Sequence, residues 1–180
     1  DVLSYIDTFP TQLRDMPSLI ISGPPGSGKH TIALVVVGGF SPSAMRYEKK
    51  LSIPVGSGTS QDAPSVSMGD IHFEADMALP CFGGRAAWTS AHNAIVSAVE
   101  IRKVKAAIVL CKNFHRADRD LSRVFASFMT ARTGHVALRY IILTEHFSTL
   151  SLDIRRMCCH IPVGRPGIVR SRRLRGDAVS

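Results

Sequence analysis

The segment SLIISGPPGSGKHT, residues 18–31, most constrains what this chain can fold into. An apolar run leads into a turn rich in glycine, and Lys29 and a helix-compatible segment follow. The pattern G-x-x-x-x-G-K-[ST] is met from Gly23 to Lys29 and fails at its last position, which is His30. A strand, such a loop and a helix in that order predict a P-loop, which holds the phosphates of a nucleotide.

The residue types of this loop suit a polyphosphate better than the alternative, a plain turn between a strand and a helix. Gly23, Gly26 and Gly28 allow backbone angles closed to other residues, so successive N–H groups can turn inward around an anion. The following helix points its positive end at the same place, and Lys29 adds a mobile charge for the β- and γ-phosphates. The residues predicted to bind ATP or ADP are Gly23, Pro24, Pro25, Gly26, Ser27, Gly28, Lys29, His30 and Thr31.

The position after the lysine weakens the case for Mg²⁺. A hydroxyl normally stands there and binds the metal, whereas the imidazole of His30 is a poor ligand for a hard ion that prefers oxygen. Thr31 comes one position late, which on a helix is a rotation of roughly 100°. We therefore expect nucleotide binding with Mg²⁺ disfavoured, and the sequence predicts no other metal site.

A P-loop ATPase also needs carboxylates at the end of a second buried strand, one for Mg²⁺ and one to polarise the attacking water. The continuous apolar run Ala106–Cys111 predicts that strand, but Lys112 and Asn113 follow it. Lys112 would add positive charge where the metal should bind. His115 is a candidate base, with a surface or hydrogen-bonded histidine as the alternative, and no catalytic residue is assigned.

Other acidic residues follow two further predicted strands. Glu145 comes directly after the buried run Tyr140–Thr144 and is the best remaining carboxylate for the nucleotide site. It would act as a sensor of the γ-phosphate or as an indirect metal ligand, and the alternative is a loop acid with no role. Glu74 and Asp76 lie at and after the end of the alternating segment Ile71–Glu74, and we interpret both as structural.

Strands and helices alternate along the chain, which predicts an α/β fold with a mainly parallel sheet. Helices are predicted over Asp1–Thr8, Lys29–Val37 with Gly38 and Gly39 ending it, Arg85–Glu100, Asp118–Ala131 with Asp118 as its cap, and Leu152–Met157. Buried strands are predicted over Leu19–Ser22, Ala106–Cys111, Tyr140–Thr144 and Cys159–Val163, and extended segments over Met45–Val55 and Ser65–Glu74 around the loop Gly56–Pro64.

Length, cysteine content and charge limit the functional classes. The 180 residues suit one domain, expected over residues 1–165, followed by a basic tail over residues 166–180. No apolar run is long enough to cross a membrane, and four cysteines without a C-x-x-C spacing favour a reduced, intracellular protein. The net charge of +8 favours a nucleic-acid partner, with a solvated basic surface as the alternative.

Two pairs of arginines are candidate contacts to DNA or to a neighbouring subunit. Arg119 and Arg123 lie on the helix predicted over residues 118–131 and would follow a phosphate backbone. Arg155 and Arg156 lie on a short predicted helix and would reach a phosphate on a neighbouring subunit as an arginine finger. A solvated basic turn is the alternative for the second pair.

Several segments in sequence order resemble the AAA+ module of replication factor C small subunits, the clamp-loader ATPases. They are the P-loop region Met16–Ala33, the strand Ile71–Asp76, the Walker B strand and helix Ala107–Met129, the sensor 1 strand Arg139–Ser148 and the segment Ile154–Cys158. The resemblance implies a three-layer P-loop fold with a mainly parallel five-stranded sheet and a small β insertion. It implies a role in DNA replication with other loader subunits, a sliding clamp and DNA, in the nucleus or at a viral replication site.

The chain departs from that family at four positions. Lys29-His30-Thr31 resembles the variant P-loop of the branch with weak or absent ATPase activity, and Lys112-Asn113 stands where the family has its catalytic glutamate. Glu145 stands at the sensor asparagine, and Met157 at the arginine finger, next to Arg156. The resemblance therefore implies a nucleotide-binding subunit with weak or no hydrolysis, whose lid domain would begin after residue 165. The alternative is an active small P-loop enzyme such as a nucleotide kinase.

Overall fold

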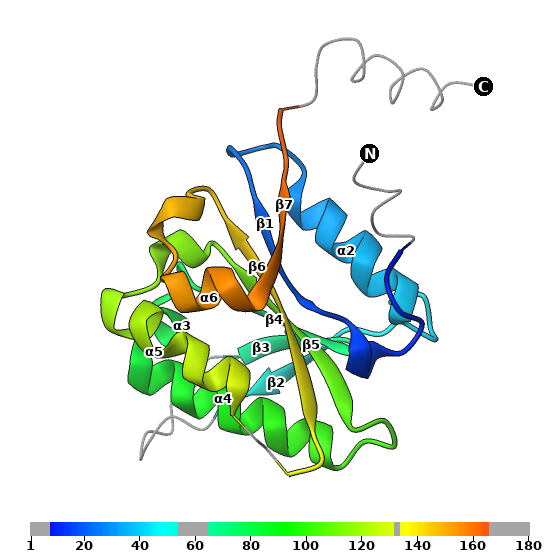
Figure 1. Cartoon of the computed structure of the whole chain (residues 1–180). Coiled ribbons are helices and arrows are strands. Elements are labelled where there is room, and N and C mark those ends of the chain that lie inside the picture. Colours follow the sequence, from blue (N-terminus) through cyan, green and yellow to red (C-terminus); the bar gives the residue numbers. More distant parts are fainter. Residues whose placement is uncertain (1–7, 54–64, 132–133, 166–180) are drawn as a thin grey trace, which may run out of the picture.

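The computed structural model describes residues 8–53, 65–131 and 134–165, which form a seven-stranded sheet in the order β2-β3-β4-β5-β6-β1-β7 (Figure 1). The strands are β1 (Ser18–Ser22), β2 (Lys49–Ser52), β3 (Ser65–Met68), β4 (His72–Asp76), β5 (Ala106–Lys112), β6 (Ala137–Thr144) and β7 (Cys158–Pro162). The α-helices are α2 (Lys29–Phe40), α3 (Pro80–Gly83), α4 (Arg85–Glu100), α5 (Arg119–Thr130) and α6 (Leu152–Met157), and the 3-10 helices are η1 (Leu13–Asp15), η2 (Phe114–Arg116) and η3 (Phe147–Thr149).

Five neighbouring strands, β4, β5, β6, β1 and β7, are parallel to one another. This confirms the predicted α/β fold with a mainly parallel five-stranded sheet. Strands β2 and β3 extend the same sheet beyond β4 as antiparallel neighbours, so the predicted β insertion is continuous with the parallel part. Because parallel strands share one direction, the loops that follow β1, β4, β5 and β6 lie at the same edge of the sheet.

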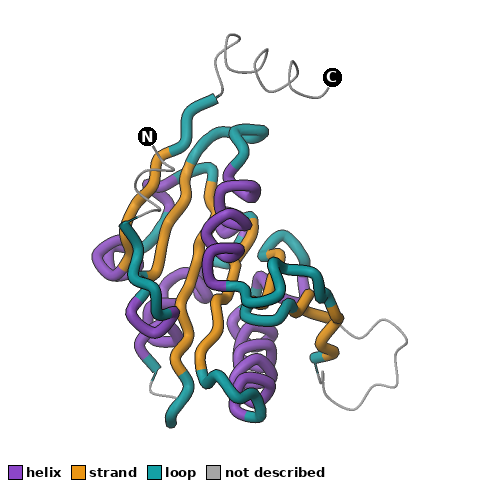
Figure 2. Tube along the Cα trace, turned by 90° about the vertical axis from the view of Figure 1, so that its right-hand side faces the viewer, coloured by secondary structure: helices purple, strands orange, loops and turns teal. Residues whose placement is uncertain are grey.

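Helices cover both faces of the parallel strands, which gives three layers (Figure 2). On one face α2 packs Val36 and Val37 into a cluster that includes Leu19 and Ile21 of β1. Ile20 points to the other face, where residues of α4, α5 and α6 form a second cluster. Successive strand residues alternate between the faces, so a strand with helices on both sides is apolar on both, as residues Leu19–Ile21 of β1 are.

Phe125 of α5 is at the centre of an aromatic group in the second cluster and is fully buried. Its ring centroid lies 4.7 Å from that of Phe114, 5.2 Å from that of Trp88 and 5.6 Å from that of Tyr140. These residues come from η2, α4 and β6, so the group joins two helices to the sheet beside the loop that follows β5.

The first helix continues past the glycines that were expected to end it. α2 runs through Gly38 and Gly39 to Phe40, which packs against the apolar cluster on this face. A Cβ at Gly38 would lie 3.5 Å from the Cε of Met45, so this methionine packs directly on the helix. This packing offsets the roughly 1 kcal/mol that each glycine costs a helix relative to alanine.

The extended segment predicted over Ser65–Glu74 is two strands, β3 and β4, joined by a tight turn. The carboxylate of Asp70 anchors this turn, because it accepts hydrogen bonds from the hydroxyls of Ser41 and Ser43 at 2.6 Å each. Arg102 donates to the Asp70 carbonyl at 2.7 Å from the end of α4. These contacts from distant segments hold the turn through which β3 and β4 pair as antiparallel strands.

Two further predictions concern ends and termini. Asp118 precedes α5 as expected, but its side chain makes no capping hydrogen bond, and its backbone N–H instead donates to the Gly83 carbonyl at 2.9 Å.

The predicted N-terminal helix up to residue 7, the loop 56–64 and the basic tail 166–180 lie outside the described residues. Among the described helices, none combines the length and apolarity needed to span a membrane.

Phe125→Ala is expected to lower the free energy of unfolding by about 3–5 kcal/mol, because it removes a fully buried ring and leaves a cavity between two helices and the sheet. Urea unfolding followed by circular dichroism measures this loss. Val35→Ala on the exposed side of α2, where the side chain is 46% exposed, is the control and should change stability by less than about 0.5 kcal/mol. A similar effect from both variants would contradict the packing described above.

Candidate phosphate-binding site

The P-loop connects β1 to α2 at the edge of the sheet where the parallel strands end. Gly26 and Gly28 have φ angles of 72° and 85°, in the left-handed region that favours glycine, and Gly28 is the residue from which α2 begins. Ile32 N–H donates to the Gly28 carbonyl at 3.0 Å, so the helix starts directly at the loop. The positive end of α2 therefore faces the space that the loop surrounds.

Gly23 was expected to share this backbone freedom, but its φ is not in the left-handed region, and a glycine is needed there because the end of β7 approaches closely. A Cβ on this residue would lie 2.2 Å from the backbone oxygen of Val163. Around it, Gly23 N–H donates to the Thr144 carbonyl at 3.2 Å, and Val163 N–H donates to the Ser22 carbonyl at 2.7 Å. The start of the loop is thus held between the ends of β6 and β7.

A pocket of about 450 Å³ opens beside the loop. Its lining residues are Gly26, Ser27, Gly28, Lys29, His30, Thr31, Lys112, Asn113, His115, Leu143 and Thr144. Six of the nine predicted loop residues line it, and the other three, Gly23, Pro24 and Pro25, form the part of the loop toward which Lys29 turns. The lining contains two lysines and no aspartate or glutamate, so its character suits an anion.

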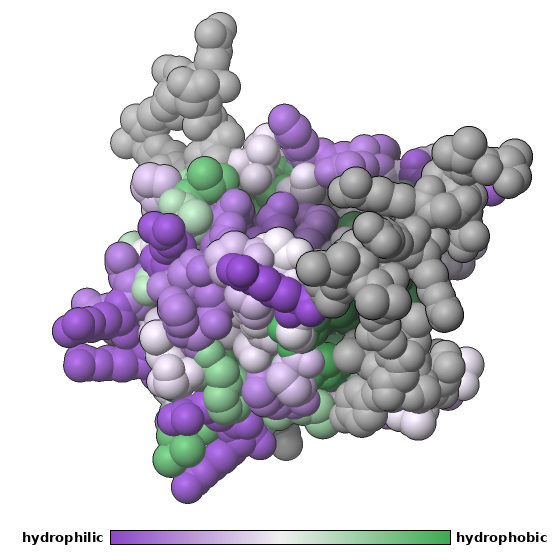
Figure 3. All heavy atoms as spheres, turned by 90° about the horizontal axis from the view of Figure 1, so that it is seen from above, coloured by the Kyte–Doolittle hydropathy of each residue, from purple (hydrophilic) through white to green (hydrophobic). Residues whose placement is uncertain are grey.

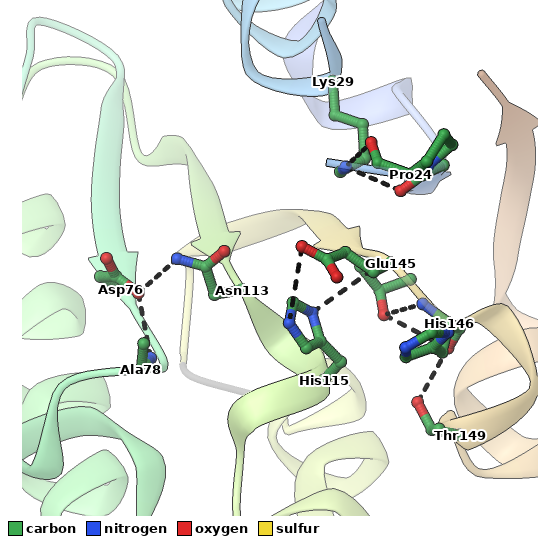
Figure 4. A network of polar contacts seen from close by, with 11 residues as sticks. Pro24, Lys29, Asp76, Ala78, Asn113, His115, Glu145, His146 and Thr149 are labelled. Carbon is green, nitrogen blue, oxygen red and sulfur yellow. Dashed lines mark hydrogen bonds and ion pairs between the residues drawn. The ribbon is translucent and has the colours of Figure 1, made fainter. Parts of the chain in front are cut away.

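Lys29 lies folded back on its own loop (Figure 4). Its Nζ donates to the backbone oxygens of Gly23 at 2.7 Å and of Pro24 at 2.8 Å. Nearby, the Ser27 hydroxyl is buried and has no hydrogen-bond partner among the described residues. Both groups are donors within the loop, and an anion in the pocket would offer them acceptors.

Glu74 of β4 was interpreted as structural, but its carboxylate contacts two residues that line the pocket. Lys112 Nζ lies 3.1 Å from Glu74 Oε2, and His30 Nε2 lies 3.3 Å from the same oxygen. His72 Nε2 lies 3.6 Å from Oε1. The residue after the P-loop lysine and the residue at the end of β5 therefore meet at one carboxylate that the sequence pattern did not assign to the site.

The pairing of β4 with β5 explains this meeting. The two strands are parallel neighbours, and the register sets Asp76 opposite Lys112. The end of β5 therefore lies beside the last residues of β4. Glu74 is 13% exposed, and contacts with His72 and Lys112, together with the charge of His30, lower its pKa to about 2 despite burial. The carboxylate is therefore ionised throughout the physiological range.

Glu145, the other predicted carboxylate, does not line the pocket and instead faces His115 (Figure 4). Its backbone N–H donates to His115 Nδ1 at 3.4 Å, and its Oε1 lies 3.9 Å from His115 Nε2. Burial lowers the pKa of His115, which Glu145 opposes. A neutral His115 that accepts at Nδ1 carries its proton on Nε2, on the side of Glu145.

Asn113, at the position of the expected catalytic glutamate, is turned toward β4. Its Nδ2 donates to Asp76 Oδ1 at 2.9 Å, and the same oxygen accepts from Ala78 N–H at 3.0 Å (Figure 4). The backbone of Asn113 is in the left-handed region, with φ of 52°, which an asparagine tolerates. Asp76, interpreted as structural, therefore does hold the loop after β5.

The donor set at this site does not fit Mg²⁺. An imidazole stands at the position of the metal-binding hydroxyl, and the nearest carboxylate, Glu74, is already paired with the Lys112 ammonium. Within the described ranges, no group of three or more histidine, cysteine, aspartate or glutamate side chains is arranged to hold a metal ion.

The four candidate arginines lie apart from this pocket. Arg119 and Arg123 are exposed on α5 and line a second pocket, of about 460 Å³, together with His115. On α6, Arg156 is exposed, whereas the guanidinium carbon of Arg155 lies 5.6 Å from the centre of the Phe147 ring. Arg156 is thus the freer member of the second pair. The described part of the surface seen from above in Figure 3 is mainly hydrophilic.

The three-layer fold is similar to that of AAA+ P-loop NTPase domains of known structure. The FIGL-1 AAA domain in complex with ADP matches with a TM-score of 0.56 and 16% identity, over 98% of this chain and 53% of that one. The Holliday junction branch migration motor RuvB of Thermotoga maritima matches with a TM-score of 0.52 and 10% identity, over 91% and 43%. A DNA polymerase III gamma subunit-related protein from the same organism matches with a TM-score of 0.52 and 11% identity, over 93% and 46%.

At these identities the likeness is one of fold. The chain spans about half the length of the proteins whose structures it matches. No protein-family model matches the sequence, and no curated protein matches it.

Ionisation of Glu74 is expected to stabilise the fold above pH 4.5 and to do so progressively less as the pH falls toward 2, because its pKa is lowered from 4.5 to about 2. Between pH 6 and about pH 3.5 this residue should account for about 1 kcal/mol of lost stability. Glu74→Gln should remove that part of the loss in urea unfolding. Glu100→Gln, at an exposed position on α4, should leave the pH dependence as in the wild type, and equal profiles for all three proteins would contradict the lowered pKa.

Proposed function

We propose that this chain is a nucleotide-binding subunit of a clamp-loader-like assembly that acts in DNA replication. It binds ATP or ADP through residues 23–31 and hydrolyses ATP weakly or not at all. The observation that carries the proposal is the pocket at the start of α2, which combines two left-handed loop glycines, the N-terminus of the helix, two lysines and no acidic lining residue. The ADP complex of the structurally similar FIGL-1 domain supports this choice of ligand.

The arrangement after β5 supports weak hydrolysis. Residues 113–117 of this loop contain no carboxylate, Asn113 is bound to Asp76, and Lys112 is paired with Glu74. The remaining candidate, Glu145, does not line the pocket and contacts the lining residue His115. Without a carboxylate to orient the attacking water, a P-loop site retains binding and loses most of its rate.

The proposed partners are other loader subunits, a sliding clamp and DNA, within the cell at a nuclear or viral replication site. Support comes from the structurally similar DNA polymerase III gamma subunit-related protein and from the net charge of +8. Arg119 and Arg123 are proposed to contact DNA, since both are exposed one helical turn apart on α5. Arg156, exposed on α6, is proposed to contact the nucleotide site of a neighbouring subunit, with Arg155 held against Phe147 as its support.

Lys29→Ala is expected to weaken ADP binding by at least about tenfold, because it removes the P-loop charge that pairs with the phosphates. Isothermal titration calorimetry of the purified chain measures the change. Lys50→Ala, at an exposed position on β2, is the matched control and should bind as the wild type does. Equal affinity of the Lys29 variant and the wild type, or no binding to the wild type at millimolar ADP, would contradict the proposal.

Phosphate release from ATP separates the proposed subunit from the alternative, a small P-loop enzyme. Tight nucleotide binding with no phosphate release, both alone and with primed DNA, is the expected result. Turnover that appears only when a nucleoside or nucleotide acceptor is added would identify a kinase, and steady release from ATP alone would identify an active ATPase. Coupled phosphate detection and chromatography of the nucleotides distinguish these outcomes.

A further inference from the structure

Lys112 is the one lining residue whose charge has no counterpart in the P-loop pattern. It is the last residue of β5, at the edge of the sheet where β1 and β6 also end, and it lines the same pocket as Lys29. Its side chain is 32% exposed, so the ammonium group is neither buried nor free in solvent.

Glu74 fixes the direction of this ammonium group. The carboxylate lies 3.1 Å from Lys112 Nζ and does not line the pocket, so it holds the lysine at the wall without adding an acidic group to the lining. His30 and His72 contact the same carboxylate and constrain it from α2 and from its own strand, β4. Charged groups in fixed positions bind an anion better than mobile ones, because less side-chain freedom is lost on binding.

The charged side chains that line the pocket do not favour a divalent cation. Lys29 and Lys112 both line it, and no aspartate or glutamate does. A Mg²⁺ ion that entered with a nucleotide would meet repulsion from both ammonium groups and no free carboxylate. A metal-free nucleotide carries more negative charge than its Mg²⁺ complex, and the ammonium groups of Lys29 and Lys112 in the lining would attract it.

We propose that Lys112 replaces the metal ion as a built-in cation, so that the site takes the metal-free nucleoside di- or triphosphate rather than its Mg²⁺ complex. The proposal rests on the nucleotide binding proposed above and concerns the form of the ligand. Lys112 contacts the phosphates directly, and Glu74 is a positioning residue that acts through it.

The test is titration of the wild-type chain with ADP in excess EDTA and again in millimolar MgCl₂. The expected affinity is equal in the two conditions within about twofold, or lower with Mg²⁺. Binding that is tenfold or more tighter with Mg²⁺ would overturn the proposal and leave the nucleotide-binding function standing. No binding in either condition would overturn both.

Variants at residue 112 provide the second measurement. Lys112→Met should weaken ADP binding in EDTA by at least about tenfold, Lys112→Arg should keep most of the affinity, and Lys103→Met, outside this pocket, should bind as the wild type does. Far-UV circular dichroism and thermal unfolding establish that each variant is folded.

The double variant His30→Thr, Lys112→Asp restores an oxygen donor at each of the two positions, and ADP should then bind more tightly with Mg²⁺ than with EDTA. Unchanged binding by Lys112→Met in EDTA would overturn the proposal, whatever the double variant does.

Discussion

The parallel pairing of β1 between β6 and β7 is the constraint on which the rest of the site depends. Backbone hydrogen bonds from Gly23 to Thr144 and from Val163 to Ser22 continue this pairing past the strand ends and fix where the loop begins. The 2.2 Å that would separate a Cβ at Gly23 from the Val163 oxygen shows how closely the three segments approach. Because the neighbouring strands are parallel as well, the C-terminal ends of β5 and β6 line the same pocket.

The electrostatics of the site depend on one largely buried carboxylate, that of Glu74. Glu74 contacts both Lys112 and His30, the residue at the end of β5 and the residue that follows the P-loop lysine. The same cluster lowers the pKa of Glu74 to about 2, which keeps the carboxylate ionised. His30 and Lys112, which both differ from the residues of a P-loop ATPase, are therefore linked through one carboxylate.

Most of the fold followed from periodicity and turn chemistry. The helix over Arg85–Glu100 was predicted at its observed bounds, and the apolar runs of β1, β5 and β6 were predicted within a few residues, because buried parallel strands must be apolar on both faces. The failures share a cause. The extension of α2 to Phe40 and the turn at Asp70 both depend on packing or hydrogen bonds from distant segments, which no local pattern contains.

The sequence by itself determined the P-loop, since glycine spacing and a following lysine act locally, and it determined the absence of a carboxylate directly after β5. Only the tertiary structure decided that Glu74 belongs to the site and that Glu145 faces His115 instead of the pocket. The physical reason is that sheet register brings together side chains far apart in the sequence, such as Glu74 and Lys112. Which charges meet is therefore set by strand pairing and not by spacing along the chain.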